Sequence, residues 1–294
     1  MSIATLQAIL SSIIIVMVAL THANEHHVAN GQPHAKHDRA HSHSHPKHKH
    51  EHKNPHRNLR PAPKAEGSGH GPEPGQWKDA HATFYGPPEG TLGGACGYED
   101  SDKKIYGPET TALSKALFND GMTCGACFEI KCGEGSEWCK PGHPTVHVTA
   151  TDFCPGGGEG WCDSPKEHFD MSQPAFLKIA EYKGGIVPVK YRRVPCKRSG
   201  GIRFKITGNP YFNMIGITNM GGTGDIAKVE VKVGVQWTAL KHNYGDRWDT
   251  NADLVGKKLT FRITTSDGKT MITEQAAPHD WRFGQTYQGS RVVA

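Results

Sequence analysis

The sequence predicts an all-β protein with two folded domains, and three observations support that prediction. From Trp77 onward, short runs rich in β-branched and aromatic residues are separated by turns rich in Gly and Pro. The eight cysteines all lie between Cys96 and Cys196, which sets this stretch apart from the remainder of the chain. After residues 198–201 the helical patterns end, and alternating strands continue without them.

The first 23 residues have the pattern of a secretory signal peptide. Their apolar run, residues 9–20, is 12 residues long, which is too short to cross a bilayer as a helix. Thr21 and Ala23 place small residues at the −3 and −1 positions of a cleavage site after residue 23. The sequence therefore predicts a secreted, extracellular protein.

Residues 24–76 differ in composition from the rest of the chain. They contain twelve of the 19 histidines, with five prolines before Gly67 and almost no large apolar side chains. Such a segment buries too little surface to offset the entropy of ordering, so we expect it to be disordered. Its eight Lys and Arg against five Asp and Glu account for +3 of the formal net charge of +5. The folded remainder is close to neutral, which argues against a nucleic-acid-binding protein.

The even number of cysteines in a secreted chain indicates disulfides. Eight cysteines form four bonds when all are paired. The alternative is a zinc site, because Cys124 and Cys127 form a C-x-x-C motif. Secretion and the lack of a second C-x-x-C motif favour disulfides. No cofactor is expected.

The first folded domain, residues 77–205, reads as strands interrupted by two helices. The strand candidates are the runs "HATFYG", "CFEIKC", "TVHVTATDF" and "IVPVKYRRV". Residues 110–121 have an apolar helical face that ends at Gly121. Residues 172–185 begin with Ser172 as N-cap and carry Pro174 in the first turn, so they predict a second helix.

The second domain, residues 206–294, reads as a small β-sandwich. Apolar residues alternate in 202–206, 229–237 and 259–263, and the last run is followed by an Asp-Gly turn. Trp237 continues the inward series of valines, so we expect it in the core. Trp248 and Trp281 are expected there too.

Several motifs between residues 80 and 288 resemble those of the plant α-expansins. They are "AHATFYG", "GGACGY", "CGACFEIKC", "HFD", "GIVPVKYRRVPC" and "FGQTY". The resemblance implies a six-stranded double-ψ β-barrel, similar to the family 45 endoglucanases, followed by an immunoglobulin-like sandwich similar to a family 63 carbohydrate-binding module. It further implies a monomeric protein that loosens plant cell walls at acidic pH without hydrolysis, acting on cellulose and matrix glycans such as xyloglucan. The family's disulfide pattern implies the pairs Cys96–Cys124, Cys127–Cys196, Cys132–Cys139 and Cys154–Cys162.

The resemblance also implies a groove in the barrel. Asp170 in "HFD" matches the general acid of the related inverting endoglucanases, and Pro87 stands where those enzymes have their catalytic base. Inversion requires a second carboxylate, so we expect no hydrolysis and no catalytic residue. The alternative is a weak glycanase that uses Asp170 as acid and Asp152 as base.

Three further groove residues accompany Asp170. Alternation in residues 81–86 places Thr83 and Tyr85 on one face of a strand and Phe84 on the other. His168 either contributes to the groove or only orients the loop. Without the resemblance, Asp170 itself reads as a cap for the helix that follows.

In the sandwich, the resemblance points to an aromatic row of Tyr211, Phe212 and Tyr244 as the polysaccharide-binding surface. Flat sugar faces stack on exposed rings. Tyr211 and Phe212 are adjacent, so a regular strand would expose only one of them and a bulge is required to expose both.

The histidine-rich extension offers three hypotheses. At around pH 5 its histidines are mostly protonated, so it would bind acidic pectin and release it as pH rises. The second hypothesis is weak Zn²⁺ or Cu²⁺ binding by His41, His43, His45, His48 and His50, which acid opposes. The third is a solvated spacer or a cleaved pro-segment.

Overall fold

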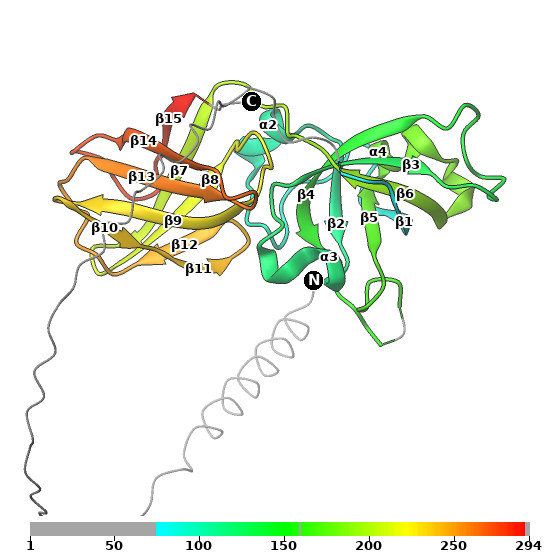
Figure 1. The fold of residues 1–294 in the computed structure, drawn as a ribbon, viewed down its shortest axis with the longest axis horizontal. Coiled ribbons are helices and arrows are strands. Elements are labelled where there is room, and N and C mark those ends of the chain that lie inside the picture. Colours follow the sequence, from blue (N-terminus) through cyan, green and yellow to red (C-terminus); the bar gives the residue numbers. More distant parts are fainter. Residues whose placement is uncertain (1–74, 159, 292–294) are drawn as a thin grey trace, which may run out of the picture. The chain divides into compact units, whose positions relative to one another are not determined.

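A computed structural model describes residues 75–158 and 160–291, which form two β-architectures (Figure 1). The predicted signal peptide, and all of the histidine-rich extension except residues 75 and 76, lie outside the described residues. None of the helices in the described part is long and apolar enough to cross a bilayer. Residues Ala65–Ala294 belong to one unit by their contacts.

Six strands close into the predicted barrel, drawn in cyan and green in Figure 1. Their order around it is β1-β5-β2-β4-β3-β6, with β1/β5 and β2/β4 parallel and the other neighbours antiparallel. The strands are β1 (Lys78–Tyr85), β2 (Thr110–Leu113), β3 (Cys127–Cys132), β4 (Thr145–Phe153), β5 (His168–Ser172) and β6 (Val187–Arg193).

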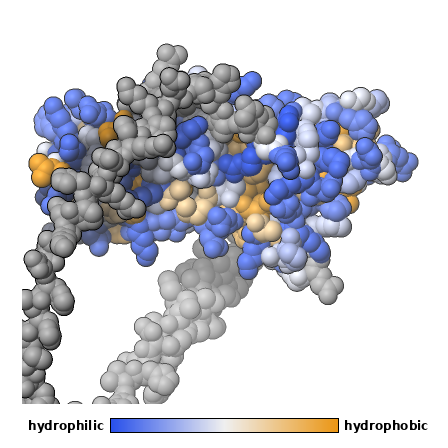
Figure 2. Space-filling model, in the orientation of Figure 1, coloured by the Kyte–Doolittle hydropathy of each residue, from blue (hydrophilic) through white to orange (hydrophobic). Residues whose placement is uncertain are grey.

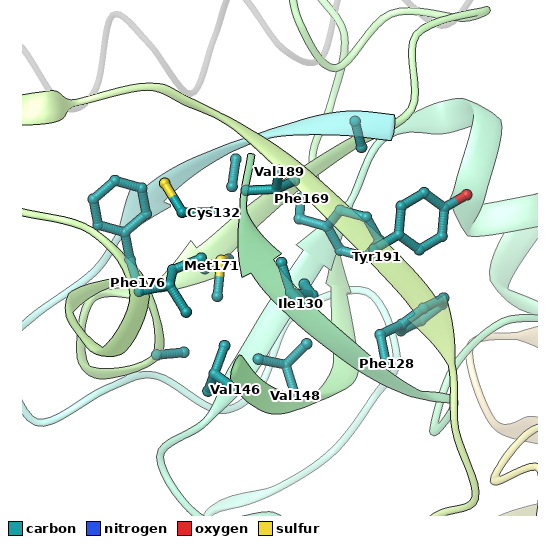
Figure 3. Packing of buried hydrophobic residues seen from close by; sticks show 14 of the residues in the cluster. Phe128, Ile130, Cys132, Val146, Val148, Phe169, Met171, Phe176, Val189 and Tyr191 are labelled. Atoms are coloured by element: carbon teal, nitrogen blue, oxygen red, sulfur yellow. The ribbon is translucent and has the colours of Figure 1, made fainter. Parts of the chain in front are cut away.

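Alternate residues of these strands fill the barrel interior (Figure 3). Phe128 meets Phe169 edge-on, with ring centroids 5.2 Å apart, and Tyr191 packs 4.8 Å from Phe169. Ile130 and Met171 are completely buried beside them. Each such side chain contributes about 1.5–3 kcal/mol by leaving water. Since β1 and β5 turn these apolar residues inward, their other faces are free to carry polar groups.

The helix predicted from Ser172 is confirmed, although it is shorter than expected. It is α4 (Gln173–Ile179), with Ser172 at the N-cap position and Pro174 in the first turn. The Ser172 hydroxyl does not cap the helix, because it donates to the Pro108 carbonyl at 2.6 Å. The other short helices are η1 (Asp100–Asp102), α2 (Lys103–Tyr106), α3 (Lys115–Phe118), η2 (Asn119–Gly121) and η3 (Tyr182–Gly184).

The helix predicted over residues 110–121 is wrong for its first four residues. Thr110–Leu113 form strand β2, whose four side chains are all buried between β4 and β5. Helical structure is present from Lys115 onward, as the single turn α3 (Lys115–Phe118) followed by the 3₁₀ turn η2 (Asn119–Gly121). Tertiary pairing in the barrel overrides the local pattern, as the two β-branched threonines favour.

The remaining nine strands form the predicted sandwich, drawn in yellow to red in Figure 1. One sheet has the order β10-β9-β13-β14 and the other β11-β12-β8-β7-β15. Phe204 and Phe261, one from each sheet, stack 4.8 Å apart in the core. The strands are β7 (Gly201–Asn209), β8 (Phe212–Thr218), β9 (Ile226–Val233), β10 (Gln236–Ala239), β11 (Lys241–Tyr244), β12 (Arg247–Thr250), β13 (Leu259–Thr265), β14 (Thr270–Ala277) and β15 (Thr286–Arg291). The boundary drawn between residues 205 and 206 falls inside β7.

The alternating run 229–237 is not one strand. β9 ends at Val233 and pairs directly with Gln236, so Gly234 and Val235 form a two-residue hairpin turn. Gly234 has φ 61°, which this turn requires, and Val235 is 91% exposed. The prediction that Trp237 lies in the core is therefore wrong: it is half-buried under the Arg262 guanidinium, 4.5 Å from the ring. Trp248 and Trp281 are buried as predicted.

The structure contains the four disulfides that the resemblance implies. They join Cys96–Cys124, Cys127–Cys196, Cys132–Cys139 and Cys154–Cys162. All four lie before β7, so within the described residues the sandwich contains no disulfide and packs around its own apolar core. Polar contacts also connect the two architectures: the Arg193 guanidinium pairs with buried Asp225 at 2.8 Å, and the Tyr106 hydroxyl accepts from the Asn219 amide at 3.2 Å.

Candidate functional site

The strand register aligns three predicted groove positions and Ala112 in one row across the barrel. Asp152 of β4 pairs with Ala112 of β2, Ala112 pairs with Asp170 of β5, and Asp170 pairs with Thr83 of β1. Paired residues on neighbouring strands share a face. The two acids are thus two strands apart, roughly 10 Å between their backbones. Ala112, which lies between them, has only a methyl side chain and is buried.

Asp170 is one end of a hydrogen-bonded chain whose central member is Thr83. The Thr83 hydroxyl donates to Asp170 Oδ1 at 2.7 Å, and His168 Nε2 lies 2.9 Å from the same hydroxyl. Burial raises the pKa of Asp170, the Thr83 hydrogen bond lowers it in part, and the negative charge of Asp152 raises it. Asp170 therefore loses its proton at a higher pH than an exposed aspartate does.

His168 is almost completely buried, and its protonation differs from that of a surface histidine. Burial, with a smaller effect of His81, lowers its pKa to about 4. Its Nδ1 has no hydrogen-bond partner within the described residues. At a wall pH near 5, the imidazole is therefore mostly neutral. Because Thr83 gives its proton to Asp170, His168 donates through Nε2 and keeps an unpaired Nδ1.

Asp152, on strand β4, is held by hydrogen bonds from three other residues. Its Oδ1 accepts from the backbone amides of Ala95 at 2.7 Å and Phe153 at 2.8 Å, while Oδ2 accepts from the Tyr85 hydroxyl at 3.3 Å. Gly94 has φ 80°, and a Cβ at this residue would overlap the Asp152 carboxylate. A glycine at this position is what allows the loop to wrap the acid.

The alternation predicted for residues 81–86 is present. Thr83 and Tyr85 reach the two acids, whereas Phe84 packs on the other side, 4.7 Å from Phe176 of α4. Tyr85 keeps its proton, because burial and the negative charge of Asp152 raise its pKa. Pro87 follows β1 in an exposed turn, where its carbonyl accepts from the Gly90 amide at 2.9 Å. Its side chain has no group that can take up a proton.

The three predicted sandwich aromatics are all exposed, to 85% for Tyr211, 36% for Phe212 and 47% for Tyr244. Both adjacent residues are accessible because Tyr211 lies in the turn between β7 and β8, and Phe212 is the first residue of β8. A hairpin turn, rather than a bulge within a strand, therefore exposes both rings. In this turn Asn209 Oδ1 accepts from the backbone amides of Tyr211 and Phe212 at 2.9 and 3.1 Å.

Register places Phe212 and Tyr244 on the same face of the five-stranded sheet. Tyr244 pairs with Arg247, which pairs with Gly216 of β8, an even number of residues from Phe212. Ile215 on the opposite face is completely buried. Tyr244 also approaches the barrel, since a Cβ at Gly97 would lie 3.3 Å from its ring.

Sequence reasoning missed several residues that shape the groove. Ala112 and Gly94 matter for their small size, and only pairing and loop geometry reveal this. Trp161 is 43% exposed. It lies only seven residues before the predicted "HFD" motif, so an aromatic residue so close to the motif was the sequence signal that could have identified it. No group of three or more metal-ligating side chains occurs in the described ranges, and the five histidines proposed to bind metal lie outside them.

Comparison with known proteins agrees with both architectures. Residues 110–191 match the family model described as lytic transglycolase, and residues 202–278 match the Expansin C-terminal domain. The crystal structure of apo expansin from Clavibacter michiganensis has a TM-score of 0.58 at 19% identity, covering 74% of this chain and 98% of that one. A variant of that protein was solved in complex with cellohexaose, also at TM-score 0.58. At this identity the likeness concerns the fold.

The sequence relatives are much closer. Expansin-A32 of Oryza sativa subsp. japonica is 51% identical over 227 residues, which cover 74% of this chain and 84% of the relative. Expansin-A25 of Arabidopsis thaliana is 52% identical over 220 residues, which cover 72% and 79%. The chain is a member of the expansin family.

Proposed function

We propose that this expansin loosens the plant cell wall by separating non-covalent contacts between cellulose and matrix glycans, and that it breaks no glycosidic bond. One observation carries the proposal: Asp170 has a raised pKa, as a general acid needs, but Asp152, the acid that shares its row among the described residues, is occupied by other hydrogen bonds. Pro87 occupies the position that resembles the base site, and it cannot accept a proton.

Asp152 is a poor substitute for that base. Its distance from Asp170, two strands away, is close to the separation that an inverting mechanism requires. However, its two oxygens already accept three hydrogen bonds, two of them from backbone amides. A general base must take up a proton from water, but three of the roughly four lone-pair sites of this carboxylate already face protein donors. The hydrogen bonding of Asp152, rather than its distance, argues against a glycanase.

The groove acts on glycan hydroxyls instead. Asp170, Thr83 and His168 form a chain that can exchange hydrogen bonds with a sugar hydroxyl in either protonation state of Asp170. Such exchange weakens a glucan's contact with its neighbour without attacking the chain. The exposed rings of Tyr211, Phe212 and Tyr244 hold the protein on cellulose meanwhile. The cellohexaose complex of the Clavibacter michiganensis expansin variant supports a cellulose-type ligand.

The test is a creep assay on heat-killed wall strips at acidic pH, with reducing ends measured in the same bath. The purified protein is expected to extend the strips without releasing sugar. Asp170→Asn keeps the shape of the side chain but not its ionisation, and it is expected to remove most of the creep. If this variant extends the strips as fast as the parent, the site is assigned to the wrong residue.

For the histidine-rich extension, we propose that its protonated histidines attract acidic pectin in the wall. The folded domains bind xyloglucan and cellulose. The chain is extracellular, as expansins are, so the extension meets an acidic medium in which imidazoles near pKa 6.5 are charged. Pectate binding at pH 5 and pH 7.5 should differ for the full chain and not for a variant lacking residues 24–74. Equal retention of both proteins at pH 5 contradicts the electrostatic idea.

A further inference from the structure

Trp161 is an exposed aromatic residue at the edge of the barrel groove. Its ring lies 4.2 Å from the His81 ring, tilted by 38°, and stacks at 6.3 Å on the ring of buried His168. Lys166 Nζ lies 5.3 Å from the Trp161 centroid. The next residue, Cys162, is bonded to Cys154, and its carbonyl accepts from the Lys115 amide at 3.0 Å. The ring is therefore held in place by its neighbours and its backbone, yet 43% of it faces solvent.

His81 connects this ring to the acid row. On β1, the completely or largely buried Ala80 and Ala82 face the core, so His81 shares the opposite face with Thr83 and Tyr85. His81 also pairs in register with His168. From Tyr85 to His81 this face runs four residues, or about 13 Å along the strand. Trp161 extends the line by one more ring, beyond the residues that contact the acids.

A hollow of about 440 Å³ opens beside Trp161 and His81. Its other walls combine the apolar residues Pro188 and Val189 with the charged residues Glu134, Glu167 and Lys190. Lys190 pairs with Asp79 at 2.7 Å, and the Tyr191 hydroxyl donates to Glu167 at 2.7 Å. An aromatic platform bordered by charged hydrogen-bonding groups is the usual chemistry of a sugar site, in which the ring receives the flat face and the polar groups receive hydroxyls.

We propose that Trp161, backed by His81, is a sugar-stacking subsite that binds a β-1,4-linked glucan chain as it leaves the acid row. The inference rests on the proposed function of the groove and names a ligand-contacting ring in it. Among large apolar side chains of the described barrel, only Trp161 and Tyr182 are exposed. On the face shown in Figure 2, hydrophilic residues predominate and apolar ones form small separate patches. A lone ring in polar surroundings fits a glycan better than a protein partner, which would need a larger apolar patch.

The experiment is hydroxyl-radical footprinting of the full chain with cellohexaose, read by mass spectrometry at single residues. The protein carries Tyr211→Ala, Phe212→Ala and Tyr244→Ala, so protection on the barrel is not secondary to binding on the sandwich. Trp161 should be protected severalfold, whereas half-exposed Trp237 on the sandwich should react unchanged. A second arm uses a xyloglucan oligosaccharide, which distinguishes a bare glucan chain from a branched one.

Two variants sharpen the result. In the same background, Trp161→Ala should weaken cellohexaose binding about tenfold, which is what loss of one stacked ring face implies. Trp161→Phe retains a ring and should restore most of the affinity, and the matched control Trp237→Ala should not change it. Unprotected Trp161, at cellohexaose concentrations that protect Tyr211 in the parent protein, overturns the proposal.

Failure of this inference is separable from failure of the proposed function. If Trp161 is unprotected while creep still requires Asp170 and releases no sugar, the subsite is wrong and the function stands. If Trp161 is protected but creep releases sugar, the subsite stands and the non-hydrolytic function is wrong.

Discussion

The barrel groove and the sandwich face present their proposed sugar-binding groups in opposite ways. In the groove, Thr83, Asp170 and His168 are partly or fully buried and already bonded to one another. On the sandwich, Tyr211 and Tyr244 extend into solvent, and both are more than a third exposed. The groove therefore offers polar groups whose bonds must rearrange to meet a ligand. The sandwich offers rings that need no rearrangement.

This difference suits the two faces to different tasks, binding the polysaccharide and weakening its contacts. Exposed rings give affinity by covering apolar sugar faces, and they are indifferent to small shifts of the chain. The polar groups of the groove already bond one another, so binding a glucan only exchanges these hydrogen bonds for new ones and gains little free energy. Such a network therefore contributes little to affinity, but it selects ligands whose hydroxyls match its geometry. We infer that the sandwich retains the protein on the wall while the barrel acts. If this division is correct, changes to the barrel and changes to the sandwich should have different consequences.

Reduction of the disulfides should affect the barrel and spare the sandwich. The four bonds close loops of 7 to 69 residues, and each contributes about 2.5–4.5 kcal/mol on the loop-entropy model. Their loss is on the order of 10 kcal/mol, comparable with the stability of a typical domain. Hydrogen exchange in a strong reductant should rise across residues 78–193 first. Simultaneous exchange of residues 201–291 would show that the sandwich cannot fold alone.

Asp170→Asn should separate activity from stability. Losing the ionisable group should lower the creep rate about tenfold or more, because a hydrogen bond to a charged group is worth about 1.5–3 kcal/mol. The folded pKa of Asp170 is raised by burial, so its stability contribution is present at low pH and declines as the carboxyl ionises. The neutral amide avoids that loss. Its Tm at pH 7 should equal or exceed that of the parent, and a lower Tm would indicate a structural role.

Removing the three sandwich rings should weaken retention and leave the groove intact. The combined change of Tyr211, Phe212 and Tyr244 to Ala is expected to lower cellulose binding about tenfold or more, since each stacked ring contributes about 0.5–1.5 kcal/mol. The control is Ile272→Ala, which removes another exposed apolar side chain from the four-stranded sheet. If both proteins bind cellulose as the parent does, the aromatic row is not the binding surface.

A smaller effect concerns buried Asp246, where sandwich and barrel meet. Neither carboxylate oxygen has a hydrogen-bond partner among the residues that the structure describes. Burial raises its pKa well above the usual range, Arg247 lowers it in part, and Asp102 raises it. Tyr98 and Tyr106 line the same small cavity. The folded state thus holds a proton that the unfolded state releases.

The sign follows from that difference. The stability that Asp246 contributes is complete below the ordinary carboxyl pKa, near 4, and is lost as pH rises toward the raised value. The parent should therefore lose a few degrees of Tm between pH 4 and pH 7 that Asp246→Asn does not lose. Identical pH profiles for the two proteins would show that the carboxyl is ionised in the folded state.

Much of this fold could be predicted from the sequence, because its signals are local. Alternation identified β1, β3 and β13, and the N-cap serine and Pro174 identified α4. Motif resemblance placed Asp170, Thr83 and the three aromatics, and it implied the disulfide pairs. These positions depend on residue type at fixed spacing, which a sequence displays directly.

The rest depended on distant pairing. β2 was read as a helix because nothing local shows that Thr110–Leu113 will lie between two other strands. Trp237 was read as core because the turn at Gly234 shifts the alternation after it. The acid row emerges only from register, which brings Ala112 between Asp152 and Asp170. Two of the hydrogen bonds that occupy Asp152 come from distant residues, Ala95 and Tyr85, which lie 57 and 67 residues earlier in the chain.

The central claim is that a glucan can lie in this groove without being cut. Soluble sugar measured during creep of wall strips, and again with purified cellulose and xyloglucan, tests it most directly. The account predicts extension with no rise in reducing ends above the buffer control at any protein concentration. Reducing ends that grow in proportion to added protein, and disappear with Asp170→Asn, would contradict it.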